Sequence, residues 1–336
     1  MLWWSLATFV TPFARTVPLM ITARIGLGIG EGFTPGALHS MTARWIPIYE
    51  RSRVVAFDMT GVYFGIMISF PLSVWIVTHW GWPWVFYSFG FLGLLWALFW
   101  HFLVTSRPEE HPTISPAELA HIQQGSPQSD LVETVPWRLF FSSSPFWALV
   151  IGQFCTLWTW YMLLTWMPIY LVREQGFSLE EMGVYSMIPY LTMLLAANGA
   201  GWLADSLIRR GVRTTLVRKF IQSLCFVGSA VCLLLLSATT SPWLAILYLT
   251  LGMGAVATSA AGFLVNHLDI GPRYAGVLMG ITNTAGTLPG IIAPIITGFI
   301  IQFTGSWDWV FYIAAGISGM GTLIWLLFAT GERVFE

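Results

Sequence analysis

The sequence predicts an all-α protein that crosses a membrane many times. Its composition indicates this class, because 56% of the 336 residues are hydrophobic and only 9% are charged, whereas soluble domains carry about 25% charged residues. The mean hydropathy is +0.71. The 19 tryptophans fit the same class, since tryptophan gathers at membrane–water interfaces. With a formal net charge of −1, nothing points to nucleic acid, and we expect no such partner.

The apolar runs give a map of membrane spans. A helix needs about 20 residues to cross the hydrocarbon core of a bilayer. The first run is the shortest because Met1 starts inside it, so we expect a chain that is cut at its N-terminus. The ten candidate spans cover about residues 2–14, 18–43, 54–78, 83–104, 145–171, 181–204, 216–238, 243–266, 275–302 and 308–329.

The basic residues divide unequally between the two sides of this map. If the first helix runs outward, twelve of the fifteen fall on one side, Arg15 and Arg173 fall on the other, and Arg24 lies within the membrane. Basic loops stay on the cytoplasmic side of membrane proteins. We therefore expect the C-terminus on the cytoplasmic, or topologically equivalent, side.

A repeated motif divides the spans into two groups. WPWVFY at 82–87 recurs as WDWVFY at 307–312, 225 residues later, and each copy precedes a glycine-containing apolar span. Two parallel repeats are typical of membrane transporters. Because the second group holds six spans and the first holds four, the repeat predicts that two N-terminal helices are missing. We expect four parts: a helix bundle at 1–104, a cytoplasmic loop at 105–142, a six-helix bundle at 143–330 and a cytoplasmic tail at 331–336.

Two charges lie inside the second apolar run. In ITARIGLGIGEGFTP (21–35), Arg24 and Glu31 are seven residues apart, so they face nearly the same way on a helix and lie about 10 Å apart along its axis. Four glycines nearby allow other helices to approach, and Pro35 predicts a bend.

The charged pair has two interpretations. It is either an ion pair that locks two helices or a binding site that faces a water-filled cavity. Ionisable residues inside a membrane are costly and mark functional sites, and the arginine fork suits carboxylate or phosphate. We favour the binding site, with Arg24 holding an anion and Glu31 carrying a coupled proton or cation. His39, eight residues beyond Glu31, is either a proton relay or a hydrogen-bonded core residue.

Further polar residues near the ends of spans are candidates for gating. In GWLADSLIRRG, Asp205 with Arg209 and Arg210 forms a charge cluster at the end of a predicted helix. Such a cluster either locks one conformation or anchors the helix at the membrane surface. In NHLDIGPRYAG, Asp269 and Arg273 are expected to pair across a tight turn.

Three of the uncharged polar residues within predicted spans are candidates for a binding site. Tyr161, Asn283 and Thr284 either bridge helices or line a cavity, and we select them as candidates for substrate binding. No metal-ligand spacing, nucleophile motif or phosphate-binding loop occurs, and the three cysteines sit in apolar runs. We therefore expect neither a metal nor another cofactor, and not an enzyme. A non-transporting membrane scaffold or receptor is the alternative class, but it has no need of charges that face a wet cavity.

Several longer stretches resemble a known family. RIGLGIGEGFTPG, WIPIYERSR, GWPWVFYSFG and NHLDIGPRYAGVLMGITNTAGTLPG are similar to segments of the anion transporters of the major facilitator superfamily, the group of sialin, the vesicular glutamate transporters and the sodium–phosphate transporters. GPRYAGVLMG, GSWD and LFATGE are most similar to plant and algal plastid anion transporters. The resemblance covers essentially the whole chain.

The resemblance implies twelve helices in two six-helix bundles around a central cavity, of which about ten are present here. It also implies a monomer that works by alternating access as a symporter coupled to sodium or protons. The family's fourth helix carries an arginine and a glutamate with six residues between them, which match Arg24 and Glu31. GWLADSLIRRG is similar to a conserved loop motif of the superfamily, which favours a gating role for Asp205.

Two departures from the family pattern bear on the substrate. The first two helices are absent, and in the family they carry basic residues that contact substrate and a gating motif. In FCTLW (154–158), Thr156 stands where glutamate-transporting relatives have arginine, which argues against glutamate. We expect inorganic phosphate as substrate, with an organic anion such as ascorbate, a sugar acid or a sialic acid-like compound as the alternative. The resemblance favours a plastid envelope or thylakoid membrane, with another organelle or the plasma membrane as alternatives.

Overall fold

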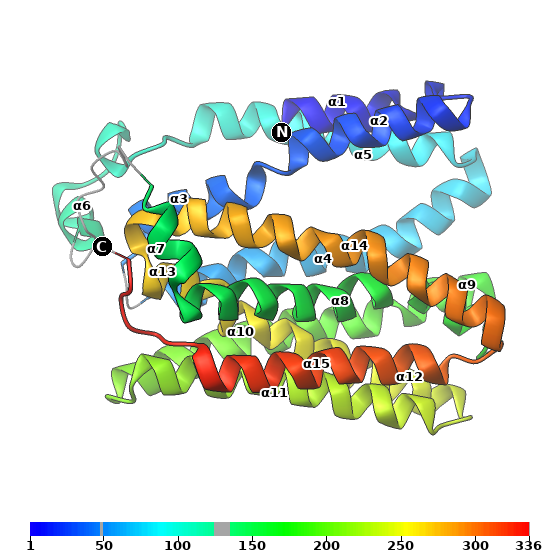
Figure 1. Ribbon diagram of the computed structural model, residues 1–336. Coiled ribbons are helices and arrows are strands. Elements are labelled where there is room, and N and C mark those ends of the chain that lie inside the picture. Colours follow the sequence, from blue (N-terminus) through cyan, green and yellow to red (C-terminus); the bar gives the residue numbers. More distant parts are fainter. Residues whose placement is uncertain (48–49, 124–134, 336) are drawn as a thin grey trace.

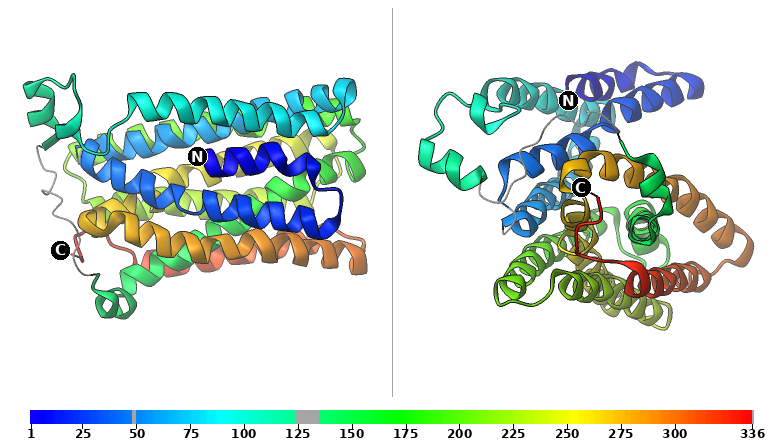
Figure 2. Two further views of the ribbon diagram at one scale, coloured as in Figure 1. Left: turned by 90° about the horizontal axis from the view of Figure 1, so that it is seen from above. Right: turned by 60° about the vertical axis from the view of Figure 1, so that its left-hand side comes forward.

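The computed structural model describes residues 1–47, 50–123 and 135–335, and all regular structure in these ranges is helical. The long helices lie side by side along one axis (Figures 1 and 2). The first half contains α1 (Leu2–Val10), η1 (Thr11–Phe13), α2 (Val17–Glu31), α3 (Thr34–Trp45), α4 (Arg51–Trp80) and α5 (Pro83–Leu103). Short elements follow: η3 (Pro108–Glu110), α6 (Pro116–Gln123) and α7 (Trp137–Ser142).

The second half is longer and more deeply buried. Its helix α8 alone has fourteen buried residues, whereas α2 has none. The elements are α8 (Ser144–Arg173), α9 (Leu179–Tyr185), α10 (Met187–Arg209), α11 (Thr214–Ser237), α12 (Pro242–Ala257), η4 (Thr258–Ala260), α13 (Phe263–Ile270), η5 (Pro272–Tyr274), α14 (Ala275–Thr304) and α15 (Asp308–Phe328).

The helix ends define two faces of the molecule. We call the end that holds α6, α7, α13 and the C-terminus the basic end, because the loops predicted to carry twelve basic residues meet there (left in Figure 1). Arg15 lies between η1 and α2, and Arg173 is the last residue of α8; both of these positions are at the opposite end. Eight helical segments of the described chain are long and apolar enough to cross a membrane.

The first two predicted spans are shorter in the structure than expected. Helix α1 is only nine residues long and continues as the 3₁₀ turn η1. The predicted span at 18–43 is divided at Gly32 and Phe33 into α2 and α3. Pro35 lies in the first turn of α3, where a residue without an N–H is tolerated at a helix start but not within a helix. In place of the expected bend, the structure has a two-residue interruption at Gly32 and Phe33, directly after Glu31.

The repeat extends from the sequence motif to the helix boundaries. Adding 225 to the bounds of α5 gives those of α15, and adding 224 to the bounds of α4 gives those of α14. The broken pair α2–α3 runs from Val17 to Trp45, and the pair α12–α13, also interrupted, runs from Pro242 to Ile270, again 225 residues later. Both halves therefore interrupt the equivalent helix at the same depth.

A buried ion pair ties α11 to α13 at the basic end. The Arg218 guanidinium binds both oxygens of Asp269, at 2.7 Å and 3.3 Å, and donates to the Ala261 carbonyl at 3.1 Å. The expected pairing of Asp269 with Arg273 is wrong, because Arg273 is exposed on η5. Arg218, far away in the sequence, offers the bidentate geometry that arginine favours with carboxylates.

Removal of Arg218 tests the weight of this pair. In Arg218→Met, Asp269 keeps a mostly buried charge without its partner, which costs about 3–5 kcal/mol, so we expect the melting temperature in detergent to fall by roughly 5–10 °C. Arg209→Met, which changes an exposed arginine, serves as the control and should shift it little. Equal losses in the two variants would contradict the role of the buried pair.

Candidate functional site

Arg24 lies on α2 in an open setting. Its side chain is exposed, and its guanidinium carbon stands 5.4 Å from the centroid of the Phe86 ring on α5, a distance at which a cation is attracted to an aromatic face. A methyl group added at Gly28, one turn further on, would meet no atom within 4 Å. The Arg24 guanidinium therefore lies against α5 through the Phe86 ring. Its N–H groups remain available to bind an anion.

Glu31 lies at the end of α2 and acts electrostatically on a residue of the second half. It is the last residue of α2 and is exposed, and its carboxylate lies within electrostatic range of the Tyr161 hydroxyl on α8. The Tyr161 ring packs on Gly290 of α14, where an added Cβ would lie 3.3 Å from it. Three ion pairs join described residues, and none of them includes Arg24 or Glu31. The structure thus gives no support to a locking ion pair at this position.

Asn283 takes part in a polar contact between α8 and α14. Its Oδ1 accepts a hydrogen bond of 3.3 Å from Nε2 of Gln153. Gln153 is only 2% exposed, and its Oε1 has no hydrogen-bond partner among the described residues. Sequence reasoning missed Gln153, although a lone amide within an apolar span was a signal for it. By contrast, the Thr284 hydroxyl donates to the Gly280 carbonyl of its own helix at 2.9 Å.

Two further positions from the sequence analysis, His39 and Thr156, add no described side chain to the site. His39 belongs to α3, but its side chain lies outside the described residues. Thr156 is buried inside the second half, where its hydroxyl donates to the Gly152 carbonyl and accepts from Gln222 at 3.2 Å.

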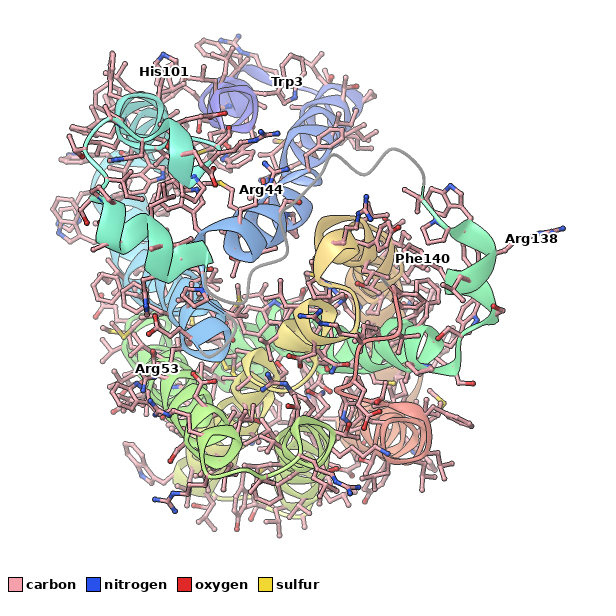
Figure 3. The ribbon with its side chains drawn as sticks, turned by 90° about the vertical axis from the view of Figure 1, so that its left-hand side faces the viewer. Trp3, Arg44, Arg53, His101, Arg138 and Phe140 are labelled. Atoms are coloured by element: carbon pink, nitrogen blue, oxygen red, sulfur yellow. The ribbon has the colours of Figure 1, made fainter. Side chains whose placement is uncertain are left out.

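Asp205 joins α10 to the start of α4 at the basic end. It is 3% exposed, and its Oδ2 accepts a hydrogen bond of 3.2 Å from the backbone N–H of Arg53. The Arg53 Nε lies 3.8 Å from the same oxygen, and its guanidinium carbon is 4.2 Å from the Trp202 ring centroid. Figure 3 looks onto this end and shows Arg53 at the junction.

The structure does not show the predicted cluster of Asp205 with Arg209 and Arg210, because Asp205 pairs with Arg53. Both Arg209 and Arg210 are exposed and enter none of the ion pairs that the structure describes. The spacing of Asp205 and Arg209 permits a pair along one helix. The carboxylate instead faces the first turn of α4, where backbone N–H groups lack partners and the helix dipole attracts a negative charge.

A second junction at the basic end joins α3 to α14. A Cβ added at Gly276 would overlap the Ser40 hydroxyl and lie 3.0 Å from the Gly36 carbonyl oxygen. The two helix ends are therefore in backbone contact, which only glycine permits. Towards the opposite end, α14 remains beside α8, whereas α2 lies with α1 (Figure 1). The first and second halves thus meet at the basic end through α3–α14 and α4–α10.

The contact between α4 and α10 continues away from the basic end. Asn198 donates a hydrogen bond of 2.6 Å to the Thr60 hydroxyl, and the rings of Phe70 and Tyr190 stack at 5.7 Å. These contacts form a second set of packed side chains between the halves. The Asp205 junction is therefore one end of a continuous helix pair.

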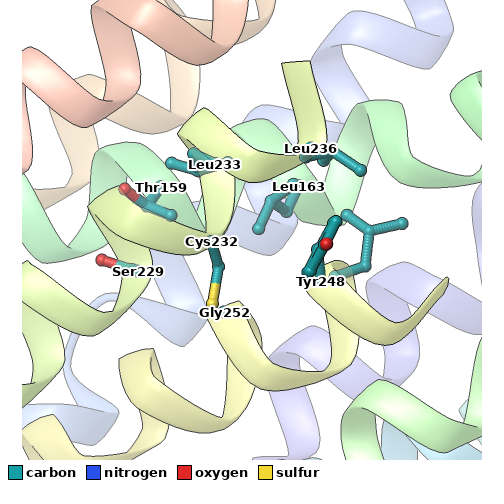
Figure 4. Close-up of a pocket in the computed structure, with 9 residues that line it drawn as sticks. Thr159, Leu163, Ser229, Cys232, Leu233, Leu236, Tyr248 and Gly252 are labelled. Carbon is teal, nitrogen blue, oxygen red and sulfur yellow. The ribbon is translucent and has the colours of Figure 1, made fainter. Parts of the chain in front are cut away.

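A pocket between α8, α11 and α12 is a poor candidate for an anion (Figure 4). Leucine side chains, Cys232 and the hydroxyl-bearing residues Thr159, Ser229 and Tyr248 line it. No charged side chain contributes to this lining. No group of three or more metal-ligating residues occurs within the described part of the chain.

These features define a polytopic helical membrane protein built from two repeated halves, in which Arg24 and Glu31 share the helix before an interruption and enter no ion pair among the described residues. Residues 1–294 match the family model of the Major Facilitator Superfamily. The chain belongs to this family.

Comparisons with individual proteins agree with this assignment. The chain is 44% identical to the chloroplastic ascorbate transporter of Arabidopsis thaliana and 42% identical to the chloroplastic sodium-dependent phosphate transport protein 1 of the same plant. These matches cover 99% and 100% of the chain but only 62% and 66% of the two relatives. The chain thus spans less than two thirds of their length.

A solved structure supports the fold. The proton:xylose symporter XylE, bound to 6-bromo-6-deoxy-D-glucose, superposes with a TM-score of 0.74 at 14% identity, over 98% of this chain and 80% of that one. At this level of identity, the likeness concerns the fold alone.

Substitutions of Asp205 should lower the stability of the protein by different amounts. Asp205→Ala removes both the charge and the hydrogen-bond acceptor at the start of α4, at a cost of about 1–2 kcal/mol. Asp205→Asn keeps an acceptor oxygen and should lose less stability. Thermal unfolding in detergent would measure the order wild type, Asn, Ala, with the exposed Glu174→Ala as control. If Asp205→Ala melted at the same temperature as Glu174→Ala, the junction would not contribute to the stability of the fold.

Proposed function

We propose that this protein is a secondary active transporter that moves an anion across a membrane by alternating access. The observation that carries the proposal is the placement of Arg24 and Glu31 on one helix, α2, without an ion pair to each other and with Glu31 within electrostatic range of Tyr161 in the opposite half. A charge in a membrane helix needs water, a partner or a ligand. An anion bound by Arg24 would supply that partner.

Alternating access needs a contact between the halves that opens and closes. The basic end provides two, at Asp205–Arg53 and at Gly36–Gly276. We propose that these contacts hold the basic end closed, and that the break after Glu31 lets α3 move relative to α2. Arg209, Arg210, Asp269 and Arg273 remain candidates for gating only as neighbours of these contacts.

Inorganic phosphate is the substrate that we propose first. Arginine binds phosphate oxygens through its planar fork, and a relative with 42% identity is named as a sodium-dependent phosphate transport protein. Tyr161 and Asn283 would add neutral hydrogen bonds from the second half, and Thr284 would contribute only if its hydroxyl left Gly280.

An organic anion is the second candidate. It is favoured by the relative named as an ascorbate transporter and by the amide pair of Gln153 and Asn283, since buried amides recognise sugar-type hydroxyls well. In either case we propose that Glu31, with His39 as a candidate relay, couples the anion to a proton or to sodium. The chloroplastic relatives favour a plastid membrane.

Substitution of Arg24 tests anion binding. The protein is reconstituted in liposomes, and uptake of labelled phosphate is followed under sodium or proton gradients, with ascorbate as competitor. Loss of a charge-assisted contact is worth about 1.5–3 kcal/mol, so Arg24→Ala should weaken apparent affinity roughly 10- to 100-fold. Arg24→Lys should fall between. Arg15→Ala, an exposed arginine at the opposite end, is the control, and an Arg24→Ala variant that transports like it would refute the anion site.

Substitution of Glu31 tests coupling separately. Glu31→Gln keeps the shape of the side chain but carries no charge, so it should retain exchange of anion across the membrane and lose accumulation against a gradient. Glu174→Gln, at an exposed carboxylate of the opposite end, should behave like wild type. Full gradient-driven accumulation in Glu31→Gln would assign coupling to another residue.

A further inference from the structure

The residues that follow α15 fold back over the basic end. We call residues 329–335 the C-terminal clasp. Its first part binds α11 and α13: the Gly331 N–H donates to the Thr215 hydroxyl at 2.9 Å, and the Asn266 side chain donates to the Thr330 carbonyl at 2.8 Å. A Cβ at Gly331 would lie 2.7 Å from the Thr215 backbone nitrogen. Only glycine permits this close approach.

The second part of the clasp binds the end of α13. The backbone N–H groups of Val334 and Phe335 both donate to the Ile270 carbonyl, at 2.8 Å and 2.9 Å. This carbonyl belongs to the last turn of α13, where helix carbonyls have no partner of their own helix. The clasp therefore takes the place of a helix cap.

Phe335 anchors the clasp in an aromatic cluster. It is 1% exposed, and its ring centroid lies 4.7 Å from that of Phe140 on α7. Phe140 also contacts Tyr274 of η5 at 5.7 Å, edge to face. An added Cβ at Gly271 would lie 3.3 Å from Phe335, so the ring rests directly on the turn between α13 and α14. Figure 3 shows Phe140 pointing into the bundle while Arg138 points away from it.

The turn held by the clasp leads directly to the junction between the halves. From Gly271, the chain passes through η5 and reaches Gly276, which is in backbone contact with Gly36 and close to Ser40 of α3. A backbone contact without side chains tolerates little displacement, because any shift of the turn separates or overlaps the two helices. The position of the turn therefore decides whether α14 meets α3.

We propose that the C-terminal clasp positions the turn between α13 and α14, and thereby stabilises the state in which the basic end is closed. Phe335 acts as a positioning residue, since it touches the turn and lies outside the charged site. Release of the clasp shifts the protein towards the state in which the basic end is open. The proposal rests on the alternating-access function proposed above. It predicts a change in the distance between the two halves at the basic end, which can be measured without transport.

The test measures that distance without substrate. Spin labels are placed at Leu103→Cys on α5 and Val212→Cys before α11, both exposed, with the native cysteines replaced by alanine, and pulsed dipolar spectroscopy gives the distance distribution in liposomes. Phe335→Ala removes the anchor. Gly331→Val obstructs the first part of the clasp. Phe328→Ala, at an exposed phenylalanine on the last turn of α15, is the matched control.

We expect Phe335→Ala and Gly331→Val to shift the distribution to longer distances, with a roughly tenfold rise in the ratio of open to closed populations, and Phe328→Ala to match the parent. The proposal is overturned if both clasp variants keep the parent distribution, or if Phe328→Ala shifts it equally. A parent protein that changes this distance but takes up no anion would refute the proposed function alone. Monodisperse elution of each variant excludes unfolding as the source of a shift.

Discussion

Every charge inside a membrane helix needs a partner or contact with water, and the polar architecture of this protein follows from that constraint. Asp205 is buried and binds the start of α4, and Asp269 is nearly buried and binds Arg218. Both carboxylates therefore hold neighbouring helices together. Arg24 and Glu31 have no ion-pair partner among the described residues, which leaves them available for a ligand and a coupled ion.

The two halves have matching helix boundaries but differ in the charges on the equivalent helices. The break between α2 and α3 recurs between α12 and α13, 225 residues later. At the same offset from Arg24 and Glu31 stand Leu249 and Val256, both buried. The backbone interruption is therefore a property of the repeat, whereas the charged site belongs to the first half. The second half contributes neutral groups, among them Tyr161 and the Gln153–Asn283 pair, so in the proposed site the charges and the neutral hydrogen-bonding groups come from different halves.

Contacts at the basic end connect distant parts of the sequence. The C-terminal clasp, α7 and the turn before α14 meet in one aromatic cluster, and the same turn leads to the backbone contact with α3. The proposed release of the clasp would therefore act on the junction between the halves through only a few residues of packed chain. Packed contacts of this kind have discrete arrangements rather than continuous ones, which suits the alternating access proposed above.

The sequence by itself determined the helical class, the repeat, the two charges and most of the spans, because these depend on hydrophobicity along one chain and on residues only a few turns apart; the interruption of the span at 18–43 came from the structure. It also contained the Asp205 and Asp269 carboxylates, but not their partners. Tertiary structure alone decided that Asp205 meets Arg53, that Asp269 meets Arg218 instead of Arg273, and that Phe335 reaches Phe140. These partners lie up to 195 residues apart, and local periodicity carries no information about which helix ends meet after packing.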